Sequence, residues 1–542
     1  MITHVRNNTE TKTNAGVLVD TLETLGVDSI FGYPGAAVLS VYNELSKSNK
    51  INHYLVRHEQ SAVHAAEGYA RISGKTGVVL VTSGPGFTNT ITGIANAYAD
   101  STPLIVLSGY VESSRNTKTF QNVDIETLAK TCSKKTYILQ KNDDIKQVIE
   151  NAFSIASSGV KGPVVIGLPR NLLESNYTPK NIKRNGVVTQ LRNFSQEIEI
   201  LQSLIKKSSK PVILTGGGCT NASNELNIFA KKINAPVVST LMGIGTFPTD
   251  DKNYLGMIGI NGTYPANSAI NESDLIIALG VSFSDRSTCK NTEYAIKKDI
   301  VSINIKYLSE NLKLQIKADV KEFLEQFNAA DYKSEILNSN WIARTQSLKK
   351  ENISDNLSGN ELHSSYVIKT ISEFMQKYHP VVVTDVGQHQ MTTAQFFTFK
   401  EPRKFITSGG MGTMGFGLPA AIGAYIADKN NLILNITGDG SYQMNLQELA
   451  TCREHNIPLK IIIMNNSSLG MVQQLQEKIY NNQYQVKMTN PDFVKIAEAY
   501  DLFAIRVENN TDLIPALEQT IEHKGTAIID IAINAPEKFN NY

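Results

Sequence analysis

Two short polar motifs near the C-terminal end of the chain have the residue types and spacing of a metal site. Gly438-Asp439-Gly440 is followed by residues 441–464 and then by Asn465-Asn466. An apolar run, 431–437 (NLILNIT), precedes the first motif, and a second, 459–464 (LKIIIM), precedes the asparagines. If both runs are buried parallel strands, Asp439 and Asn466 reach the same edge of a sheet, where α/β proteins bind ligands. One carboxylate and one amide oxygen beside a helix N-terminus suit a Mg²⁺ ion that holds a diphosphate.

The same third of the chain contains a second glycine-rich segment. Residues 408–417 read SGGMGTMGFG, and residues 385–390 (DVGQHQ) precede them. Glycines let the backbone approach a flat or anionic ligand closely, and Met414 stands among them as a bulky, polarizable side chain. Taken alone, the segment favours a tight turn with a buried methionine. Next to Asp439 and Asn466, it favours a ligand site.

The first and middle thirds carry weaker candidates. Glu59, in the segment 56–60 (VRHEQ), opens a predicted helix, where an acidic side chain is often only a partner of the helix dipole. The glycine run 216–218 follows an apolar run, which is the shape of a phosphate-binding turn, and residues 240–242 (TLM) and 280–286 (GVSFSDR) come further along. An ordinary loop is the alternative interpretation of each of these middle segments.

Short apolar runs that end in Gly, Ser or Asp recur along the chain and alternate with helical patterns. Continuous apolar strands that alternate with helices predict parallel sheets covered on both faces. We therefore expect an α/β protein with three doubly wound parallel-sheet domains. The predicted strands are 77–81, 103–107, 163–168, 211–214, 275–279, 301–305, 381–383, 432–436 and 459–464, and helical patterns include 15–25, 61–72 and 446–455.

Two polar stretches predict the domain boundaries. Residues 176–186 (NYTPKNIKRNG) and 349–361 (KKENISDNLSGNE) read as linkers. We expect the three domains at 1–180, 190–345 and 360–542.

The charge and composition of the chain limit the kinds of partner and compartment that we expect. The 542 residues carry a formal net charge of +1, which gives no electrostatic reason to expect nucleic acid or an anionic membrane as partner. No apolar run approaches the roughly 18–20 residues of a membrane span. The polar N-terminus, residues 1–13, lacks the apolar core of a signal peptide, so we expect a cytoplasmic protein. Cysteines at positions 132, 219, 289 and 452 form no C-x-x-C pair and predict free buried thiols.

Together these motifs resemble the thiamine-diphosphate enzymes, which carry GDG and NN at this spacing. Within that superfamily the chain looks most like the acetolactate synthase (acetohydroxyacid synthase) catalytic subunits, over nearly its whole length. The resembling segments are 31–37 (FGYPGAA), 57–71 (RHEQSAVHAAEGYAR), 82–90 (TSGPGFTNT), 119–121 (TFQ), 216–219 (GGGC), 241–248 (LMGIGTFP), 385–391 (DVGQHQM), 407–424 (TSGGMGTMGFGLPAAIGA) and 438–451 (GDGSYQMNLQELAT).

The resemblance implies a division of labour among the domains. The first would bind the pyrimidine end of thiamine diphosphate (a PYR domain), the middle would bind FAD without net redox chemistry, and the last would bind the diphosphate with Mg²⁺ (a PP domain). The implied reaction decarboxylates pyruvate and joins its two-carbon unit to a second carbonyl compound, as in branched-chain amino acid biosynthesis. The implied assembly is a homodimer or homotetramer with active sites at the subunit interface, with or without a regulatory small subunit.

The resemblance also implies roles for individual residues. Glu59 would hydrogen-bond the aminopyrimidine ring, and Met414 would hold the two rings of the cofactor bent together. Residues near the reacting centre would be Phe120, Gln121 and Lys134, and Mg²⁺ would be bound by Asp439, Asn466 and the backbone oxygen of Ser468. Thiamine diphosphate would also contact Pro34, Gly35, Val386, Gln388, His389, Gly412, Gly438, Gly440, Ser441 and Met471. FAD would contact Gly216, Gly217, Gly218, Thr240, Leu241, Met242, Gly280, Arg286 and Asn304.

The chain departs from the family pattern mainly around the acceptor site. Arg286 matches the position that grips the carboxylate of the second keto acid, since a guanidinium fork fits a carboxylate. Two tryptophans usual in that pocket are Thr392 and Leu475 here. Further departures are Tyr110 for a Gln, Asn261 for a His, Asn304 for an Asp, and residues 531–542, where we expect the longer tail of the biosynthetic enzymes to be missing.

These departures leave more than one reaction open. Carboligation to a second keto acid, as in acetolactate synthase, is favoured by the retained Arg286. Transfer to another ketone, such as a nucleotide-linked ketosugar to give a branched-chain sugar, is favoured by the lost tryptophans. A flavin-linked pyruvate oxidase or a simple decarboxylase is a third alternative, which peroxide formation would identify. A non-enzymatic scaffold predicts loss of Glu59 or of the metal pair, and both are present.

Overall fold

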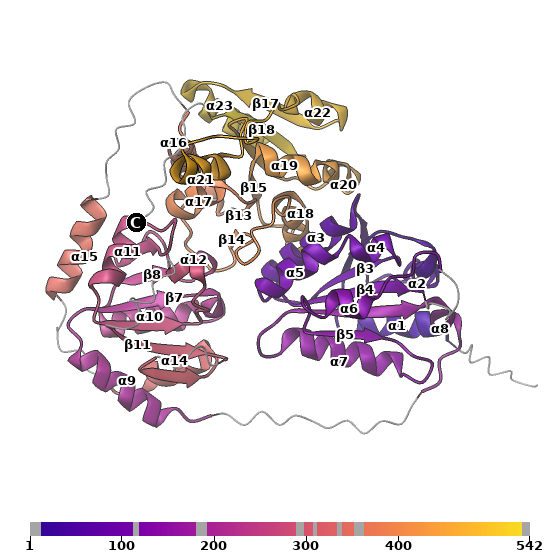
Figure 1. The fold of residues 1–542 in the computed structure, drawn as a ribbon, viewed down its shortest axis with the longest axis horizontal. Coiled ribbons are helices and arrows are strands. Elements are labelled where there is room, and N and C mark those ends of the chain that lie inside the picture. Colours follow the sequence, from indigo (N-terminus) through magenta and orange to yellow (C-terminus); the bar gives the residue numbers. More distant parts are fainter. Residues whose placement is uncertain are drawn as a thin grey trace, which may run out of the picture. The chain divides into compact units, whose positions relative to one another are not determined.

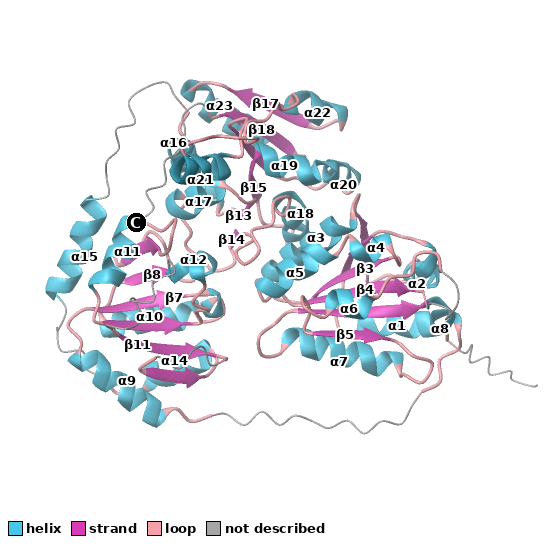
Figure 2. Ribbon diagram, in the orientation of Figure 1, coloured by secondary structure: helices cyan, strands magenta, loops and turns pink. Residues whose placement is uncertain are grey.

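The computed structural model describes residues 12–111, 119–179, 192–288, 298–306, 312–332, 339–351 and 362–533. Within these residues the strands form three six-stranded sheets, and all named strand pairs are parallel. Helices alternate with the strands along the chain (Figure 2), which confirms the predicted α/β class with three parallel sheets. Much of the predicted linkers 176–186 and 349–361, and residues 534–542 of the chain end, lie outside the described residues.

The first sheet has the strand order β2-β1-β3-β4-β6-β5. Its strands are β1 (Ser29–Gly32), β2 (Asn52–Leu55), β3 (Gly77–Val81), β4 (Leu104–Tyr110), β5 (Lys135–Ile138) and β6 (Pro163–Pro169). The helices around it are α1 (Asn14–Thr24), α2 (Leu39–Leu45), α3 (Glu59–Ser73), α4 (Pro85–Thr88), α5 (Ile91–Ala99), α6 (Ile125–Ala129), α7 (Ile145–Ser157) and α8 (Arg170–Glu174), with the short 3₁₀ helix η1 (Ala36–Val38).

The second sheet has the order β12-β11-β10-β7-β8-β9, so the chain starts in the middle and winds outward in both directions. Its strands are β7 (Pro211–Thr215), β8 (Val237–Ser239), β9 (Tyr254–Met257), β10 (Leu275–Leu279), β11 (Asp299–Asn304) and β12 (Leu314–Lys317). Its helices are α9 (Ser195–Lys207), α10 (Ser223–Ile233), α11 (Tyr264–Glu272), α12 (Asp285–Thr288), α14 (Val320–Ala329) and α15 (Ser339–Glu351), with η2 (Gly217–Cys219) and η3 (Leu241–Gly243).

The third sheet has the order β14-β13-β15-β16-β18-β17, which repeats the order of the first sheet strand for strand. Its strands are β13 (Val381–Thr384), β14 (Phe405–Ile406), β15 (Ile433–Gly438), β16 (Lys460–Asn465), β17 (Phe503–Val507) and β18 (Ala527–Ala532). Its helices are α16 (Ser364–Met375), α17 (Gln388–Phe396), α18 (Gly417–Ala427), α19 (Asp439–Asn445), α20 (Leu449–Glu454), α21 (Gly470–Tyr480), α22 (Phe493–Ala499) and α23 (Asn510–Glu522), with η4 (Gln376–Tyr378) and η5 (Leu446–Glu448).

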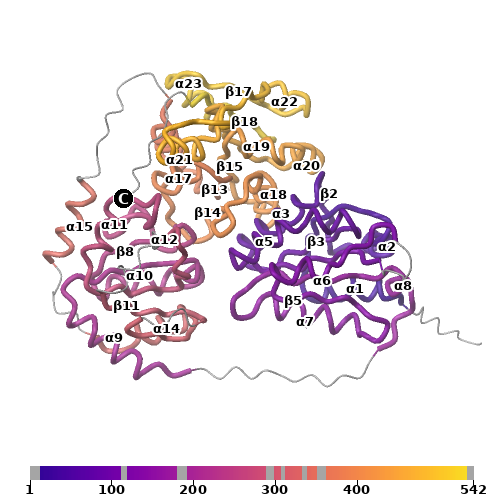
Figure 3. The backbone as a smooth tube through the Cα atoms, viewed as in Figure 1, coloured from indigo at the N-terminus to yellow at the C-terminus, as the bar shows by residue number. Residues whose placement is uncertain are grey.

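The chain divides into two compact units. The first contains Met1–Val188 together with Ile422–Asp428 and Gln447–His455, two segments from the last third of the sequence. The second contains the rest, with the second and third sheets. The elements of each unit can be followed by label and colour in Figures 1 and 3. Three predicted domains thus correspond to three sheets, but their boundaries at 180–190 and 345–360 remain predictions.

The core of the second sheet shows why its strands read as continuous apolar runs. Ile213 and Ile277 point into one cluster of buried side chains, whereas their neighbours Val212 and Ile276 belong to another. Alternate residues of a strand face opposite sides of the sheet. Both faces are therefore packed, as predicted for a parallel sheet.

The sequence also predicted buried free thiols and no apolar run long enough to span a membrane. Cys132, Cys219 and Cys452 are buried free thiols, as predicted, and burial raises the pKa of Cys219 to about 12. Cys289 lies outside the described residues. Across the described ranges, every helix is too short or too polar to cross a bilayer.

Candidate active site

The predicted metal and diphosphate residues meet at the carboxyl edge of the third sheet. β13 and β15 are neighbours there, and the chain leaves them in opposite directions across the sheet order, which creates the crevice where α/β proteins bind ligands. A pocket opens at this point. Its lining contains Ser364, Val386, Gly387, Gln388, His389, Met414, Gly438, Asp439, Gly440, Ser441, Met464, Asn466, Ser468, Leu469, Gly470, Met471, Val472 and Ile533. Every third-domain residue predicted to contact thiamine diphosphate or metal is among them except Gly412.

Asp439 is the buried carboxylate of this pocket. Its side chain is almost fully buried, and burial raises its pKa. The amide nitrogen of Asn490 donates to Asp439 Oδ2 at 2.7 Å and to Asn465 Oδ1 at 2.9 Å, and Asn465 in turn donates to Asp530. Asn465 and Asn490 were not predicted as site residues. Asn490 fixes the Asp439 carboxylate and Asn465 fixes Asn490; only the paired-asparagine motif pointed to Asn465.

Asn466 stands beside Asp439 in the pocket. Its Oδ1 accepts the backbone N–H of Ser468 at 3.0 Å, and its amide nitrogen lies 3.4 Å from Gln388 Oε1. Among the described residues no group of three or more His, Cys, Asp or Glu side chains gathers around a common point. The polar side-chain oxygens that Asp439 and Asn466 bring to the pocket are the ligand type that hard cations prefer.

His389 presents an unsatisfied nitrogen within the same pocket. Burial lowers its pKa to about 3, so the imidazole is neutral at physiological pH. Its Nε2 atom is buried without a hydrogen-bond partner. A side chain at Gly438 would place its Cβ only 2.9 Å from the ring, which explains the first glycine of the GDG motif. A buried polar atom without a partner is costly, and a diphosphate oxygen would satisfy it.

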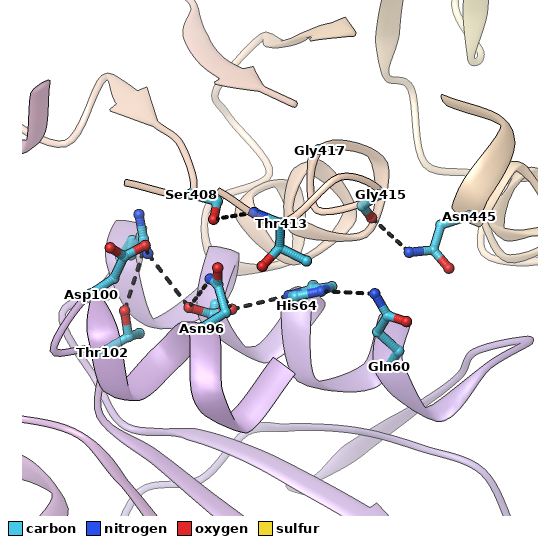
Figure 4. Close-up of polar contacts among 12 residues, drawn as sticks. Gln60, His64, Asn96, Asp100, Thr102, Ser408, Thr413, Gly415, Gly417 and Asn445 are labelled. Atoms are coloured by element: carbon cyan, nitrogen blue, oxygen red, sulfur yellow. Dashed lines mark hydrogen bonds and ion pairs between the residues drawn. The ribbon is translucent and has the colours of Figure 1, made fainter. Parts of the chain in front are cut away.

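The glycine-rich segment is held by a carboxylate that the sequence did not single out. Asp385 is buried directly after β13, and it accepts the backbone N–H groups of Val386, Gly415 and Gly417 at 2.9–3.0 Å. Asn445 adds a bond to the Gly415 carbonyl at 2.7 Å (Figure 4). These contacts fix the backbone on either side of Met414. The position of Asp385, at the end of a buried strand, was the available signal.

Glu59 lies at the corresponding edge of the first sheet. It is the first residue of α3, as predicted, and its Oε2 accepts the amide of Asn89 at 2.9 Å. Gly86 stands beside it, because a Cβ there would be 3.6 Å from Glu59 Oε1. The rest of α3 is tied to α5 by a buried network, part of which is labelled in Figure 4, that contains Gln60, His64, Glu67, Arg71, Asn96, Asp100 and Thr102.

The other first-domain predictions divide into two groups. Gly35 and Gln121 lie at the carboxyl edge with Glu59. A Cβ added at Gly35 would lie 2.5 Å from the Thr82 side chain, and one added at Gly84 would lie 2.8 Å from the Gln121 side chain. The Ser83 hydroxyl donates to Gln121 Oε1 at 3.3 Å. Pro34 is exposed, and Phe120 is 85% exposed. Phe120 therefore has little contact within this chain.

Lys134 lies apart from these residues within the chain. It lies just before β5, at the amino edge of the first sheet, whereas Glu59 and Gln121 follow the carboxyl ends of their strands. Its ammonium donates to the carbonyl oxygens of Ile155 and Ser158, at the end of α7. A cation there complements the carbonyl end of a helix. The structure does not bring Lys134 together with the other predicted catalytic residues.

The predicted FAD residues gather at the carboxyl edge of the second sheet. The segments 216–218, 240–242 and 280–286 follow β7, β8 and β10, and β7 and β10 flank the point where the strand order reverses. Dinucleotides bind at such a point. The glycines also serve packing, because a Cβ at Gly216 would lie 2.3 Å from the Gly280 carbonyl oxygen. Asn304 is buried, and its amide donates to the Val281 carbonyl at 2.8 Å.

The three predicted acceptor residues do not form one surface. Arg286 is exposed on α12, Leu475 is 44% exposed on α21, and Thr392 is fully buried in α17. Thr392 Oγ1 donates to the Gln388 carbonyl at 2.8 Å and accepts the Ser364 hydroxyl at 3.3 Å. None of the three lines the pocket at Asp439. Thr392 thus supports the backbone of Gln388.

Comparison with known proteins matches all three parts of the chain. Family models match residues 12–128 (thiamine pyrophosphate enzyme, N-terminal TPP binding domain), 198–327 (central domain) and 385–531 (C-terminal TPP binding domain). The acetolactate synthase large subunit of Buchnera aphidicola subsp. Schizaphis graminum is 40% identical, with 97% of this chain and 96% of the relative aligned. The chain belongs to the acetolactate synthase family of thiamine pyrophosphate enzymes.

Other relatives in this family extend the match. The acetolactate synthase large subunit of Haemophilus influenzae is 39% identical over 96% of this chain and 95% of the relative. The chloroplastic acetolactate synthase of Arabidopsis thaliana is 37% identical over 95% of this chain and 81% of the relative. The family of the chain is therefore as predicted. These relatives do not favour the alternative of a ketosugar carboligase.

Proposed function

We propose that this chain decarboxylates pyruvate and joins the two-carbon unit to a second 2-keto acid, as an acetolactate synthase. The observation that carries the proposal is near-complete alignment with acetolactate synthase large subunits together with a pocket that unites Asp439, Asn466 and His389. Bound thiamine diphosphate would supply the electron sink that carbon–carbon cleavage next to a carbonyl requires. The side chains of the protein would bind and orient the cofactor and the substrate, and would exchange protons with them.

The pocket fits the proposed diphosphate and Mg²⁺. A buried carboxylate with a raised pKa gains from a cation, and the orphaned nitrogen of His389 gains from a phosphate oxygen. Asp439, Asn466 and the Ser468 backbone oxygen would hold the metal, and Met414 would support the cofactor rings. The remaining contacts would come from Val386, Gln388, Gly438, Gly440, Ser441 and Met471.

Glu59 would act on the pyrimidine end of the cofactor. Its carboxylate would hydrogen-bond a ring nitrogen and exchange a proton with it, which is the role of a positioned general acid–base. Asn89 fixes one of its oxygens and leaves the other available. As the resemblance to the family implies, we propose that each active site pairs Glu59 of one subunit with the proposed metal site of another, in a homodimer or homotetramer.

FAD binding at the second sheet is part of the proposal. The reversal of strand order beside Gly216, Gly217, Gly218 and Gly280 supports it, with Thr240, Leu241, Met242 and Asn304 at neighbouring strand ends. The exposed guanidinium of Arg286 would be free to bind the carboxylate of the acceptor acid.

Product analysis tests the proposal. Purified protein would be incubated with thiamine diphosphate, Mg²⁺, FAD and pyruvate, and the products followed by NMR. We expect acetolactate, with one CO₂ released for every two pyruvates consumed. Release of CO₂ with acetaldehyde as the main product, or oxygen-dependent peroxide, would contradict the proposed function, as would carboligation that appears only when a ketosugar is added.

A further inference from the structure

The turn between β2 and α3 leaves backbone groups without partners in the sheet. The parallel register of β2 with β1 ends at Leu55, and the next backbone bond to β1 runs from Val56 N to Gly32 O at 3.3 Å. The carbonyl of Leu55 and the N–H of Arg57 then need other partners, since buried backbone groups are almost always paired. Glu59 follows two residues later, so this turn sets the position of the proposed acid–base.

A segment from the last third of the chain, residues 447–455, supplies those partners within the same compact unit. Both carboxylate oxygens of Glu448 accept the Arg57 N–H, at 3.0 and 3.2 Å. Thr451 Oγ1 lies 2.7 Å from Glu448 Oε2 and 3.2 Å from the Leu55 carbonyl, so its one hydroxyl hydrogen is shared between two acceptors. The Leu55 carbonyl also accepts Nη1 of Arg57 at 3.2 Å. The Arg57 N–H thus depends on Glu448, whereas the Leu55 carbonyl has two donors.

A second carboxylate in the segment, Glu454, can be compared directly with Glu448. Glu454 pairs with the Arg57 guanidinium at 2.5 Å, but its side chain is 44% exposed. Glu448 is fully buried. Exposed ion pairs contribute little, whereas a buried carboxylate that accepts a backbone N–H at the start of a 15-residue helix is a strong, charge-assisted contact. The ring of His455, 5.1 Å from that of Tyr54, completes the docking.

Burial of Glu448 is costly, which argues for a specific role. Burial raises its pKa, and the hydrogen bonds from Thr451, Arg57 and Ser61 oppose that rise. Ser61 lies in the first turn of α3, so Glu448 contacts the helix start on both sides of Glu59. An apolar side chain would fill the same volume at lower cost, but it could not hold the turn.

We propose that Glu448 is a positioning residue for Glu59: its carboxylate fixes the turn 55–58, so that Glu59 begins α3 where Asn89 can bind its Oε2. The inference rests on the proposed function, because it assumes that Glu59 acts on the cofactor. It also assigns a task to the segment after the GDG motif that the metal site alone does not explain.

Three variants test this assignment: Glu448→Ala, Glu448→Gln, and Glu454→Gln as the control. Amide hydrogen exchange, measured by mass spectrometry without cofactors, reports directly on the turn. In Glu448→Ala we expect exchange over residues 55–62 to be about tenfold faster or more, as for loss of one buried charged hydrogen bond, with α7 unchanged. Glu454→Gln should match the wild type.

Kinetics separate positioning from general stability. We expect kcat of Glu448→Ala to fall by about tenfold or more, with the dissociation constant of thiamine diphosphate and Mg²⁺ within about twofold of wild type, because other residues hold the diphosphate. Glu448→Gln keeps one carbonyl acceptor for the Arg57 N–H and should recover part of kcat. If Glu448→Ala does not fold, Glu448→Gln carries both measurements, with smaller effects in the same directions.

The outcomes that overturn the proposal are distinct. Faster exchange at 55–62 with unchanged kcat would make Glu448 a structural contact only. Reduced kcat with unchanged exchange would exclude action through the turn. Wild-type protein that makes no acetolactate would instead contradict the proposed function, while the exchange data would still decide whether Glu448 fixes the turn.

Discussion

Three buried polar side chains at the pocket of the third sheet differ in how fully they are satisfied, and the difference assigns their roles. Asp385 accepts three backbone N–H groups. Asp439 accepts a side-chain bond from Asn490 and backbone bonds from Gly440 and Ser467, whereas His389 Nε2 has no partner. A group whose bonding capacity is filled by the protein is structural, whereas groups left short are those that a ligand can complete. Asp385 therefore builds the pocket, and His389 Nε2 is the group left for a ligand to complete, beside Asp439 in the same lining.

Asp385→Asn tests this division. An amide would turn an N–H₂ group toward a backbone N–H of Gly415 or Gly417, leaving donors opposed in a buried place. We expect a loss of about 1–3 kcal/mol in the free energy of unfolding, measured by urea denaturation. Glu518→Gln, an exposed carboxylate on α23, is the control. A loss no larger than that of the control would mean that the glycine-rich backbone does not depend on Asp385.

At the scale of elements, Lys460 shows how strand β16 is anchored at its amino end. The residue is almost fully buried, and its ammonium donates to the carbonyls of His523 and Gly525, in the connection from α23 to β18. Burial lowers its pKa from 10.5 to about 8. The β16–β18 pair at the other end of these strands carries Asn465 and Ala532. This lysine therefore anchors the strand that ends at the proposed metal site.

The lowered pKa of Lys460 predicts a pH dependence of stability. Below about pH 8 the amine is protonated in both states, so it adds no slope. Between about pH 8 and about 10.5 the unfolded chain still binds the proton that the folded chain has released, and stability from this group rises with pH. We expect the unfolding free energy of wild type minus that of Lys460→Met to become more positive from about pH 7 to about pH 10. A flat or falling difference would contradict this.

The strands predicted from sequence are buried on both faces, although the buried strand β18 was missed. Runs such as 77–81 and 275–279 match β3 and β10, because continuous apolar sequence leaves few alternatives. The missed strands include β5 (KTYI), β12 (LQIK) and β17 (FAIRV), which lie at sheet edges and are partly exposed, so their polar residues hide the pattern.

The site followed the same logic. Motif residues at strand ends, such as Asp439 and Glu59, could be placed because neighbouring parallel strands end at one edge. Asn490 could not, since its contact with Asp439 depends on how the segment after α21 folds back. The sequence position of Lys134 likewise does not reveal which edge of the sheet it reaches, and its role near the reacting centre stays a prediction.

At the scale of the whole molecule, the first and third sheets share one strand order and carry complementary halves of the proposed machinery. The first holds Glu59 and the third holds Asp439. If each active site takes these residues from different subunits, Glu59→Gln and Asp439→Ala proteins should each be inactive alone. Mixed by co-unfolding and refolding, they should form hybrid dimers with one intact site.

Random assortment makes half of the dimers hybrid, so we expect about a quarter of wild-type acetolactate formation after mixing. The measurement is specific activity of the refolded mixture, with each variant refolded alone and refolded wild type as references. Activity that stays at the level of the single variants, although hybrid dimers are detected by native mass spectrometry, would place both residues in a site within one subunit.

The buried thiols offer a separate measure of local opening. Cys452 is 1% exposed and lies in the segment 447–455 that holds the β2–α3 turn, while Cys132 and Cys219 belong to the cores of other parts of the chain. An alkylating reagent can reach a buried thiol only during an opening event. The labelling rate of Cys452, read peptide by peptide against that of Cys132, would therefore time how often the segment releases the turn.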